Sequence, residues 1–395
     1  MKQASLYLSV LLTAALLTAC GPKVPPTPEG SGSSSSAPPN PGSSSSSEMP
    51  QSVPLTPYLV AVSEEFPYQL CGLMTLQGEP VTPEECYEIS LACCYSDAMD
   101  PTYFPVWVMR KQGPGWPENQ EFVALYAEDG SWNTDFIYHG CTSTPHGLFV
   151  GDEQNAFLLD PKTGQTLKAW SWEELQIDAP EDIPWITGDA YATAQWTGEQ
   201  LYLGCFADGK NQMLDLETGQ VSSLTDEEWI AIQDARFNSI PYWTCEIKNH
   251  TAELTREVGT EALKRTYTFE VPFDGDYSVD VEEQGGEARA CFWNQERTSC
   301  ALYTLEGEEI IPLQNGSLFF LGWNSSPERR EYCLHSPEEQ TASIYSWDGQ
   351  QIFTLPQKDG DYVTLAGSLI QVTDYSTYAN YYHPETGEKI ASFSF

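Results

Sequence analysis

One short stretch of the chain places a cysteine between two histidines. Cys141 lies between His139 and His146, and a cysteine beside a histidine base can act as a nucleophile. A polar loop near a disulfide explains the same residues, and we favour that interpretation. The five histidines have no metal-ligand helical spacing, and the chain contains no HExxH, G-x-S-x-G, P-loop or S-x-x-K motif. We therefore expect no metal and no cofactor.

Carboxylates could provide two further kinds of chemistry. Asp274 and Asp276, followed by Asp280 and Glu282, could offer oxygens to Ca²⁺. They lack the EF-hand order of ligands, so a turn between strands is the favoured interpretation. With 57 Asp and Glu in the chain, sequence alone cannot select the carboxylate pair of a glycosidase. A cell-surface glycoside hydrolase therefore stays open as an alternative function.

The N-terminus leads to a different cysteine. Lys2 gives a positive start, Ser5 to Leu17 is mostly apolar, and small residues precede Cys20. The apolar stretch is too short for a mature transmembrane helix and is typical of a secretory signal. Leu17-Thr-Ala-Cys20, with a glycine next, resembles the lipobox of bacterial lipoproteins. An ordinary signal peptide with a chance cysteine is the alternative.

The lipobox resemblance implies a signal peptide over residues 1–19, a lipid on Cys20 and an anchor at the extracytoplasmic face of the cell membrane. Residues 21–57 are rich in Ser, Pro and Gly, so we expect residues 20–57 to form a lipidated, disordered tether. Its root-mean-square reach would be roughly 30 to 35 Å. The folded part is then expected over residues 58–395.

The net charge of the chain limits the kinds of partner that it can bind. The formal net charge is −39, which argues against nucleic acid and against adhesion to anionic lipid. A basic partner is compatible with it. No second apolar stretch of membrane length exists, so the lipid is expected to be the one membrane contact.

Ten further cysteines, an even number outside the cytoplasm, make disulfides plausible. Cys71 and Cys86 are symmetric about Gly78-Glu79, and Cys291 and Cys300 are symmetric about Gln295-Glu296. With two-residue turns, facing residues around the second turn sum to 591, and each pair could bridge if it is not hydrogen-bonded. Free buried thiols are the alternative. Cys93-Cys94 is expected to have separate partners or free thiols, and no CxxC motif supports zinc.

An internal repeat organises the folded part. The stretches from Gly147 and from Gln200 each read as strand, turn, strand, tight turn, strand, and the tight turns end at Gly164 and Gly219. Related turns end at Gly307, Gly349 and Gly387. The five glycines are 55, 88, 42 and 38 residues apart. If the interval of 88 hides one divergent unit, the period is about 45 residues, which is typical of propeller blades.

These residues resemble two known repeat families. Leu158-Leu-Asp-Pro-Lys-Thr-Gly-Gln-Thr-Leu-Lys-Ala-Trp170 is similar to the blade motif of quinoprotein-type β-propellers. The stretch from Cys71 to Pro83, followed by Tyr87 and Ile89, resembles the WG repeat of bacterial surface proteins, with Cys71 in place of the usual Trp. The resemblance implies an all-β domain of antiparallel hairpin repeats, propeller-like with six to eight blades. It implies no quinone and no enzyme. A pair of β-sandwiches is the alternative.

Short segments and aromatic residues complete the prediction. Ser171 and Thr225 are expected to cap single helical turns. Seven tryptophans lie near expected loops and strand ends, where they could stack sugars, grip peptides or simply fill space between blades: Trp107, Trp116, Trp132, Trp185, Trp196, Trp243 and Trp293. The predicted function is a lipid-anchored binding or scaffold module without catalysis, with a protein, peptide or glycan as ligand. A substrate-capture lipoprotein would usually be two-lobed α/β, which the β-rich pattern disfavours.

Overall fold

The computed structural model describes most of the chain after the N-terminal segment. The described residues are 53–62, 69–82, 86–95, 101–112, 121–144, 146–175, 200–205, 210–228, 230–231, 242–257, 264–284, 286–321, 330–358 and 360–395. The expected signal peptide, Cys20 and most of the expected tether lie outside these residues. The first strand begins at Leu55, so Leu55 to Pro57, expected in the tether, belong to a strand.

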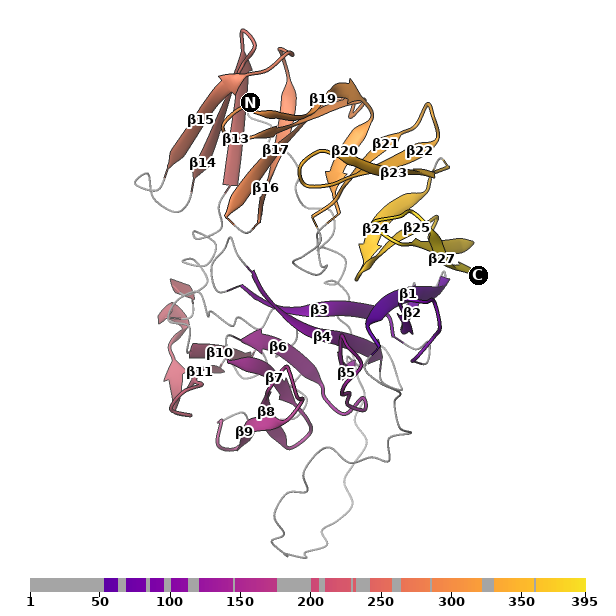
Figure 1. Cartoon of the computed structure of the whole chain (residues 1–395). Coiled ribbons are helices and arrows are strands. Elements are labelled where there is room, and N and C mark those ends of the chain that lie inside the picture. Colours follow the sequence, from indigo (N-terminus) through magenta and orange to yellow (C-terminus); the bar gives the residue numbers. More distant parts are fainter. Residues whose placement is uncertain are drawn as a thin grey trace, which may run out of the picture. The chain divides into compact units, whose positions relative to one another are not determined.

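The described part is built from antiparallel sheets (Figure 1). Sheet 1 contains β1 (Leu55–Val62) and β2 (Gln69–Thr75), and sheet 2 contains β3 (Glu88–Tyr95), β4 (Pro101–Gln112) and β5 (Glu121–Ala127). Sheet 3 contains β6 (Gly140–Thr144), β7 (Gly147–Gly151), β8 (Asn155–Leu159) and β9 (Thr166–Ser171). Sheet 4 contains β10 (Gln200–Cys205), β11 (Lys210–Asp215) and β12 (Val221–Leu224).

The second half continues in the same way. Sheet 5 contains β13 (Tyr242–Lys248), β14 (Thr251–Glu257) and β15 (Arg265–Glu270). Sheet 6 contains β16 (Tyr277–Gln284), β17 (Glu287–Asn294), β18 (Ser299–Thr304) and β19 (Glu309–Asn315). Sheet 7 contains β20 (Ser317–Phe320), β21 (Tyr332–Ser336), β22 (Thr341–Tyr345) and β23 (Gln351–Pro356). Sheet 8 contains β24 (Tyr362–Ala366), β25 (Leu369–Thr373), β26 (Tyr378–Tyr382) and β27 (Lys389–Ser394).

The strands of every sheet lie in chain order, and each neighbouring pair is antiparallel. This confirms the predicted all-β class of repeated hairpins, and the eight sheets formed by the described residues fall within the expected six to eight. Sheet 5 lies between Gly219 and Gly307, where the glycine spacing predicts one divergent unit. The turn between its first two strands contains Asn249 and His250, both at positive φ.

The five repeat glycines occupy equivalent positions, as predicted. Each lies in the turn between the last two strands of its sheet, with φ between 66° and 88°, a left-handed conformation that favours glycine. Gly78 follows β2 with φ 86°. After it the chain pairs back onto β2 through the bridges Met74–Pro80 and Cys71–Cys86, so sheet 1 has the same kind of turn.

A second reason for glycine at these turns is close packing on the preceding sheet. A Cβ at Gly164 would meet the Trp132 ring, one at Gly307 would meet Phe269 of β15, and both approaches are under 3.0 Å. The same relation joins Gly349 to Ile310 of β19, and Gly387 to Phe353 of β23. At Gly78 the neighbours are Ile390 and Ala391 of β27. The turns at Gly307, Gly349 and Gly387 therefore pack on the last strand of the preceding sheet, and the turn at Gly164 packs on the segment that follows β5. In the same way the turn of sheet 1 packs on sheet 8.

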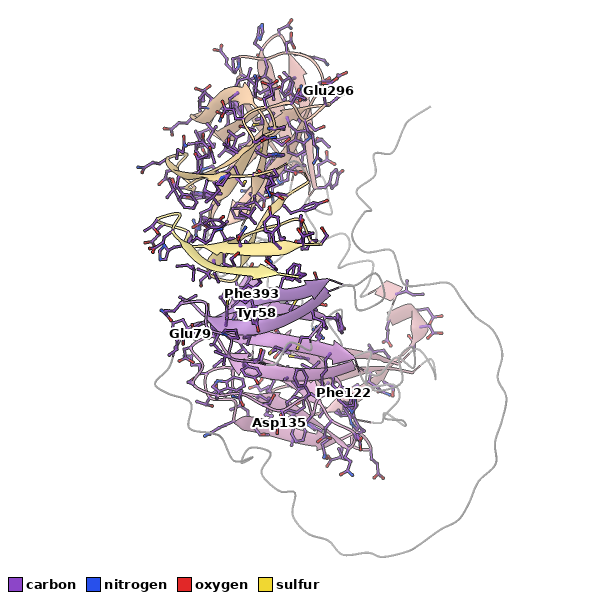
Figure 2. All side chains as sticks on the ribbon, turned by 90° about the vertical axis from the view of Figure 1, so that its right-hand side faces the viewer. Tyr58, Glu79, Phe122, Asp135, Glu296 and Phe393 are labelled. Carbon is purple, nitrogen blue, oxygen red and sulfur yellow. The ribbon has the colours of Figure 1, made fainter. Side chains whose placement is uncertain are left out.

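Apolar clusters fill the junctions between consecutive sheets. Two side chains, one from each end of the domain, show how sheets 8 and 1 meet: Tyr58 of β1 and Phe393 of β27 have ring centroids 4.9 Å apart (Figure 2). Among the described residues no such cluster joins sheets 4 and 5. The other junctions contain Leu73 and Trp107, Leu125 and Leu148, Phe149 and Leu214, Leu254 and Phe292, Leu302 and Tyr332, Ile344 and Ile370, and Leu59 and Tyr381.

The predicted caps form reciprocal hydrogen-bond pairs. The backbone N–H of Glu174 donates to Ser171 Oγ (3.2 Å), while the backbone N–H of Ser171 donates to Glu174 Oε2 (2.7 Å). Thr225 and Glu228 repeat the pattern at 3.2 and 2.8 Å. Both are capping boxes. In the described parts, no helix has the length and apolar character needed to cross a membrane.

Candidate binding site

An open pocket of about 360 Å³ lies between the turn that follows β5 of sheet 2 and the turn between β8 and β9 of sheet 3. Apolar rings and an alanine line most of it, and charged side chains stand at its border. Volumes of this size are typical of small-ligand or side-chain binding sites. The lining residues are Pro54, Pro105, Ala127, Glu128, Asp129, Trp132, Pro161 and Lys162.

Two Asp-led turns hold the walls of this pocket in place. After β5, Asp129 Oδ1 accepts a hydrogen bond from the N–H of Ser131 at 2.9 Å. After β8, Asp160 Oδ1 accepts one from the N–H of Lys162 at 2.9 Å, and the N–H of Gly164 donates to the Asp160 carbonyl at 2.8 Å. Asp in this position stabilises a turn locally. Hydrogen bonds between residues close together in the sequence therefore shape each wall of the pocket. The packing of sheets 2 and 3 brings the two walls together.

Trp132 joins the two turns. Its ring is partly buried and packs against Gly164, which has no side chain to displace it. Its indole N–H is buried and has no acceptor among the described residues. An unpaired buried donor calls for an acceptor such as a water molecule or a ligand oxygen.

The pocket is lined by side chains of both charges. Glu128 and Asp129 face a pocket that also holds Lys162. Hydrogen bonds hold the carboxyl pKa below its ordinary value at Asp215, Glu228, Glu257 and Asp374. A general acid of a glycosidase needs a raised carboxyl pKa. These four carboxylates therefore do not have the raised pKa that such a general acid needs.

The cysteine–histidine stretch does not form a nucleophile site. Cys141 is 4 % exposed in sheet 3, and burial raises the pKa of its thiol to about 12, although Arg110 works in the opposite direction. His139 precedes β6 and packs on Phe122, with ring centroids 4.9 Å apart. His146 follows β6 and donates its backbone N–H to Thr144 Oγ1. A thiol that stays protonated at neutral pH is a poor nucleophile.

The proposed calcium ligands lie in different settings. Asp274 is in an exposed turn before β16, and its Oδ1 accepts the N–H of Gly275 at 3.0 Å. Asp280 and Glu282 are inside β16, opposite Cys291 and Arg289. Among the described residues no three His, Cys, Asp or Glu side chains gather as metal ligands would.

The register predicted for Cys291 and Cys300 is wrong. Cys291 pairs with Leu302, and Cys300 pairs with Trp293, so facing residues sum to 593 rather than 591. The cause is a wider loop: Asn294 Oδ1 accepts the N–H of Thr298 at 2.8 Å and that of Ser299 at 3.1 Å. Both thiols are free, and they are diagonal rather than facing neighbours.

Cys71 and Cys86 do face one another, across an isolated antiparallel bridge. Their backbones exchange both hydrogen bonds, at 2.6 and 3.3 Å, so the pair is hydrogen-bonded and lacks the closer geometry on which the predicted bridge depends. A disulfide between Cys71 and Cys86 therefore stays a prediction. The side chains of Cys93 and Cys94 lie outside those described.

The tryptophans separate into two groups. Trp107 is 1 % exposed and donates its indole N–H to the Leu55 carbonyl at 3.1 Å, and Trp293 is 8 % exposed in a sheet junction. Trp243 donates to Glu283 Oε1 at 3.0 Å. These three side chains pack between neighbouring sheets or hydrogen-bond across them, whereas Trp132 lines the pocket. The remaining candidates, Trp116, Trp185 and Trp196, lie outside the described residues.

Sequence reasoning missed the prolines of the pocket. Pro54, Pro105 and Pro161 are far apart in the chain and follow no shared motif. The usable signal was the pair of repeat turns, Asp129-Gly130 and Asp160 to Gly164, because equivalent turns of consecutive repeats must lie side by side.

Comparison with known proteins gives only distant likenesses. No family model matches the chain, and no curated protein matches it. A crystal structure of the eukaryotic initiation factor has a TM-score of 0.38 and 11 % identity, covering 86 % of this chain and 96 % of that one. Dihydro-heme d1 dehydrogenase NirN in complex with DHE has a TM-score of 0.36 and 10 % identity, and the match covers 90 % of this chain and 77 % of that one. BamB from Moraxella catarrhalis has a TM-score of 0.26 and 12 % identity, and the match covers 86 % of this chain and 96 % of that one. Likenesses this low carry no functional information, and the all-β propeller-like fold follows from the sheets themselves.

Proposed function

We propose that this protein is a binding or scaffold module without catalytic activity, held at the extracytoplasmic face of the cell membrane by a lipid on Cys20. The lipobox-like residues Leu17 to Cys20 support the anchor, and the Ser- and Pro-rich residues that follow support a tether. A lipid and a spacer would present the folded part away from the membrane surface.

The single observation that carries the binding function is the pocket around Trp132. It is built from turns on packed sheets, and loops on a rigid scaffold are common binding surfaces. Three proline rings, one indole and a mixed-charge border suit a ligand with an apolar segment and polar edges. A protein, a peptide or a glycan can meet that description, and the strongly negative chain disfavours nucleic acid.

A comparison of two equivalent turns tests this function. Lys162 and Glu217 are both exposed and both lie two residues after the Asp of their turns, but only Lys162 lines the pocket. The detergent-solubilised full-length protein would be screened against glycans, cell-wall fragments and extracellular peptides. We expect Lys162→Ala and Trp132→Leu to weaken the binding that is found, and Glu217→Ala to leave it unchanged. Binding insensitive to both pocket variants, or no binding at all, would contradict the proposal.

A further inference from the structure

A pair of tyrosines at the other end of the strands forms a second exposed aromatic surface. Tyr362 is the first residue of β24 and is 59 % exposed, and Tyr375 in the loop between β25 and β26 is 37 % exposed. Their ring centroids are 5.2 Å apart, with a tilt of 54°. Neither ring is part of an apolar cluster formed by the described residues.

The loop that carries Tyr375 is held rigidly. Asp374 Oδ1 accepts the backbone N–H groups of Ser376 at 2.9 Å, Thr377 at 2.7 Å and Tyr378 at 3.2 Å. Thr377 also donates its hydroxyl to Asp374 Oδ2. Burial by itself would raise the pKa of Asp374, but these hydrogen bonds outweigh it and hold the pKa well below its usual range. The carboxylate that organises the loop is therefore ionised at any ordinary pH.

The backbone of Tyr375 is itself unusual. Its φ is 53°, in the left-handed region that a bulky residue rarely adopts. Its N–H donates to Thr373 Oγ1 at 2.9 Å, and Thr373 donates that hydroxyl to the Tyr378 carbonyl at 2.6 Å. A large ring that is kept on a left-handed turn and stays 37 % exposed is a strained arrangement. Such residues are enriched at functional sites.

The kind of ligand follows from shape and charge. Two tilted and partly exposed rings offer flat apolar faces, and aromatic faces stack on planar or ring-shaped groups. A chain of net charge −39 repels anionic ligands. Lys358, whose ammonium lies 5.5 Å from the Tyr378 ring centroid, adds a hydrogen-bond donor nearby. A neutral sugar combines an apolar ring face with a rim of hydroxyl groups and needs no counter-charge.

We infer that Tyr362 and Tyr375 form a stacking site for a neutral oligosaccharide, separate from the pocket around Trp132. The two sites lie at opposite strand ends, because the Trp132 pocket is lined by the turns that follow β5 and β8, the third strands of sheets 2 and 3, whereas Tyr375 follows the second strand of its sheet. A peptide adding to β24, which lies at the edge of sheet 8, is the competing occupant.

Binding measurements on the full-length protein in detergent micelles test this site. The probes would be cellohexaose, chitohexaose, maltohexaose and mannohexaose, measured by calorimetry, together with a random 12-residue peptide library. Tyr375→Asn removes the ring while keeping a residue that tolerates positive φ, and Tyr362→Ala removes the other ring. We expect at least one hexaose to bind and each variant to weaken it about tenfold. Asp374→Ala, which frees the loop but keeps both rings, should weaken it as well.

Tyr242 gives a matched control, because it is 55 % exposed on sheet 5 and lies far from Tyr362 in the chain. Tyr242→Ala should leave the hexaose affinity unchanged. The inference is overturned if none of the four hexaoses binds at millimolar concentration, if binding survives Tyr375→Asn and Tyr362→Ala, or if Tyr242→Ala reduces it equally. Tyrosine-dependent binding of library peptides without hexaose binding would also overturn it in favour of the peptide.

Discussion

Gly307 lies where sheet 6 packs on sheet 5, and a substitution there tests this packing. Both Gly307 and Gly275 have positive φ, 88° and 98°, but a Cβ at Gly307 would run into Phe269, whereas one at Gly275 meets nothing within 4 Å. Gly307→Ala should lower the free energy of unfolding by about 1–3 kcal/mol more than Gly275→Ala, because overpacking adds to backbone strain. Urea unfolding of the two variants measures the difference. Equal losses would mean that the turn does not seat on β15.

The buried thiols predict how stability depends on pH. The pKa of Cys141 is raised by burial from 9.0 to about 12. Between these values the unfolded thiol loses its proton and the folded thiol keeps it, so stability falls as pH rises through this range. Cys141→Ala should reduce the loss of unfolding free energy between pH 8 and 10.5 by about 1–2 kcal/mol. Ser143→Ala, on the same strand, changes no titrating group and serves as control. An unchanged pH slope in Cys141→Ala would count against a buried, protonated thiol.

At the scale of elements, the hydroxyl of Tyr381 in β26 accepts a hydrogen bond from the backbone of β1 and so connects the two strands. Tyr381 Oη accepts the backbone N–H of Leu59 at 2.6 Å and the amide of Gln371 at 2.8 Å. Tyr381→Phe would leave both buried donors without this acceptor, so we expect a loss of about 1–3 kcal/mol in the free energy of unfolding. Tyr362→Phe, which changes a mostly exposed ring, should cost little. Chemical unfolding that ranks the two variants in the opposite order would refute the tie between sheets 1 and 8.

At the scale of the whole molecule, charge should make stability depend on salt. The net charge of −39 repels itself more in the compact state than in the extended one. Raising ionic strength from 0.01 to 0.15 M shortens the Debye length from about 30 to about 8 Å. We expect Tm to rise by several degrees, measured by calorimetry on the full-length protein. A constant or falling Tm would mean that the acidic groups are already compensated.

The anchor is also a property of the whole molecule. Cys20→Ser should release the protein from the membrane fraction without unfolding it, because the expected tether separates Cys20 from β1. Detergent-free fractionation and circular dichroism measure the two parts of this prediction. Continued membrane association of the Ser variant would argue against a lipid on Cys20.

Local sequence patterns were sufficient to predict the repeated hairpins. They were not sufficient to predict which residues face each other on paired strands. The Asp-x-x-Thr-Gly turns at Gly164 and Gly219 could be predicted because Asp side chains and glycine conformations act over a few residues. The facing pairs around Gln295-Glu296 could not, because Asn294 caps a wider loop in which Arg297 takes a φ of 54°. A change of two residues in loop length moves every facing partner, and no propensity of the flanking strands reveals it.

The sequence by itself determined the all-β class, the equivalent turn glycines and the capping boxes at Ser171 and Thr225, because neighbours in the chain form each of them. Only the tertiary structure decided that each turn seats on the preceding sheet, that Gly78 meets β27, and that Trp132 and three distant prolines share one pocket. Contacts between sheets join residues that are distant in the sequence, such as Trp132 and Gly164, and packing rather than local propensity brings these residues together.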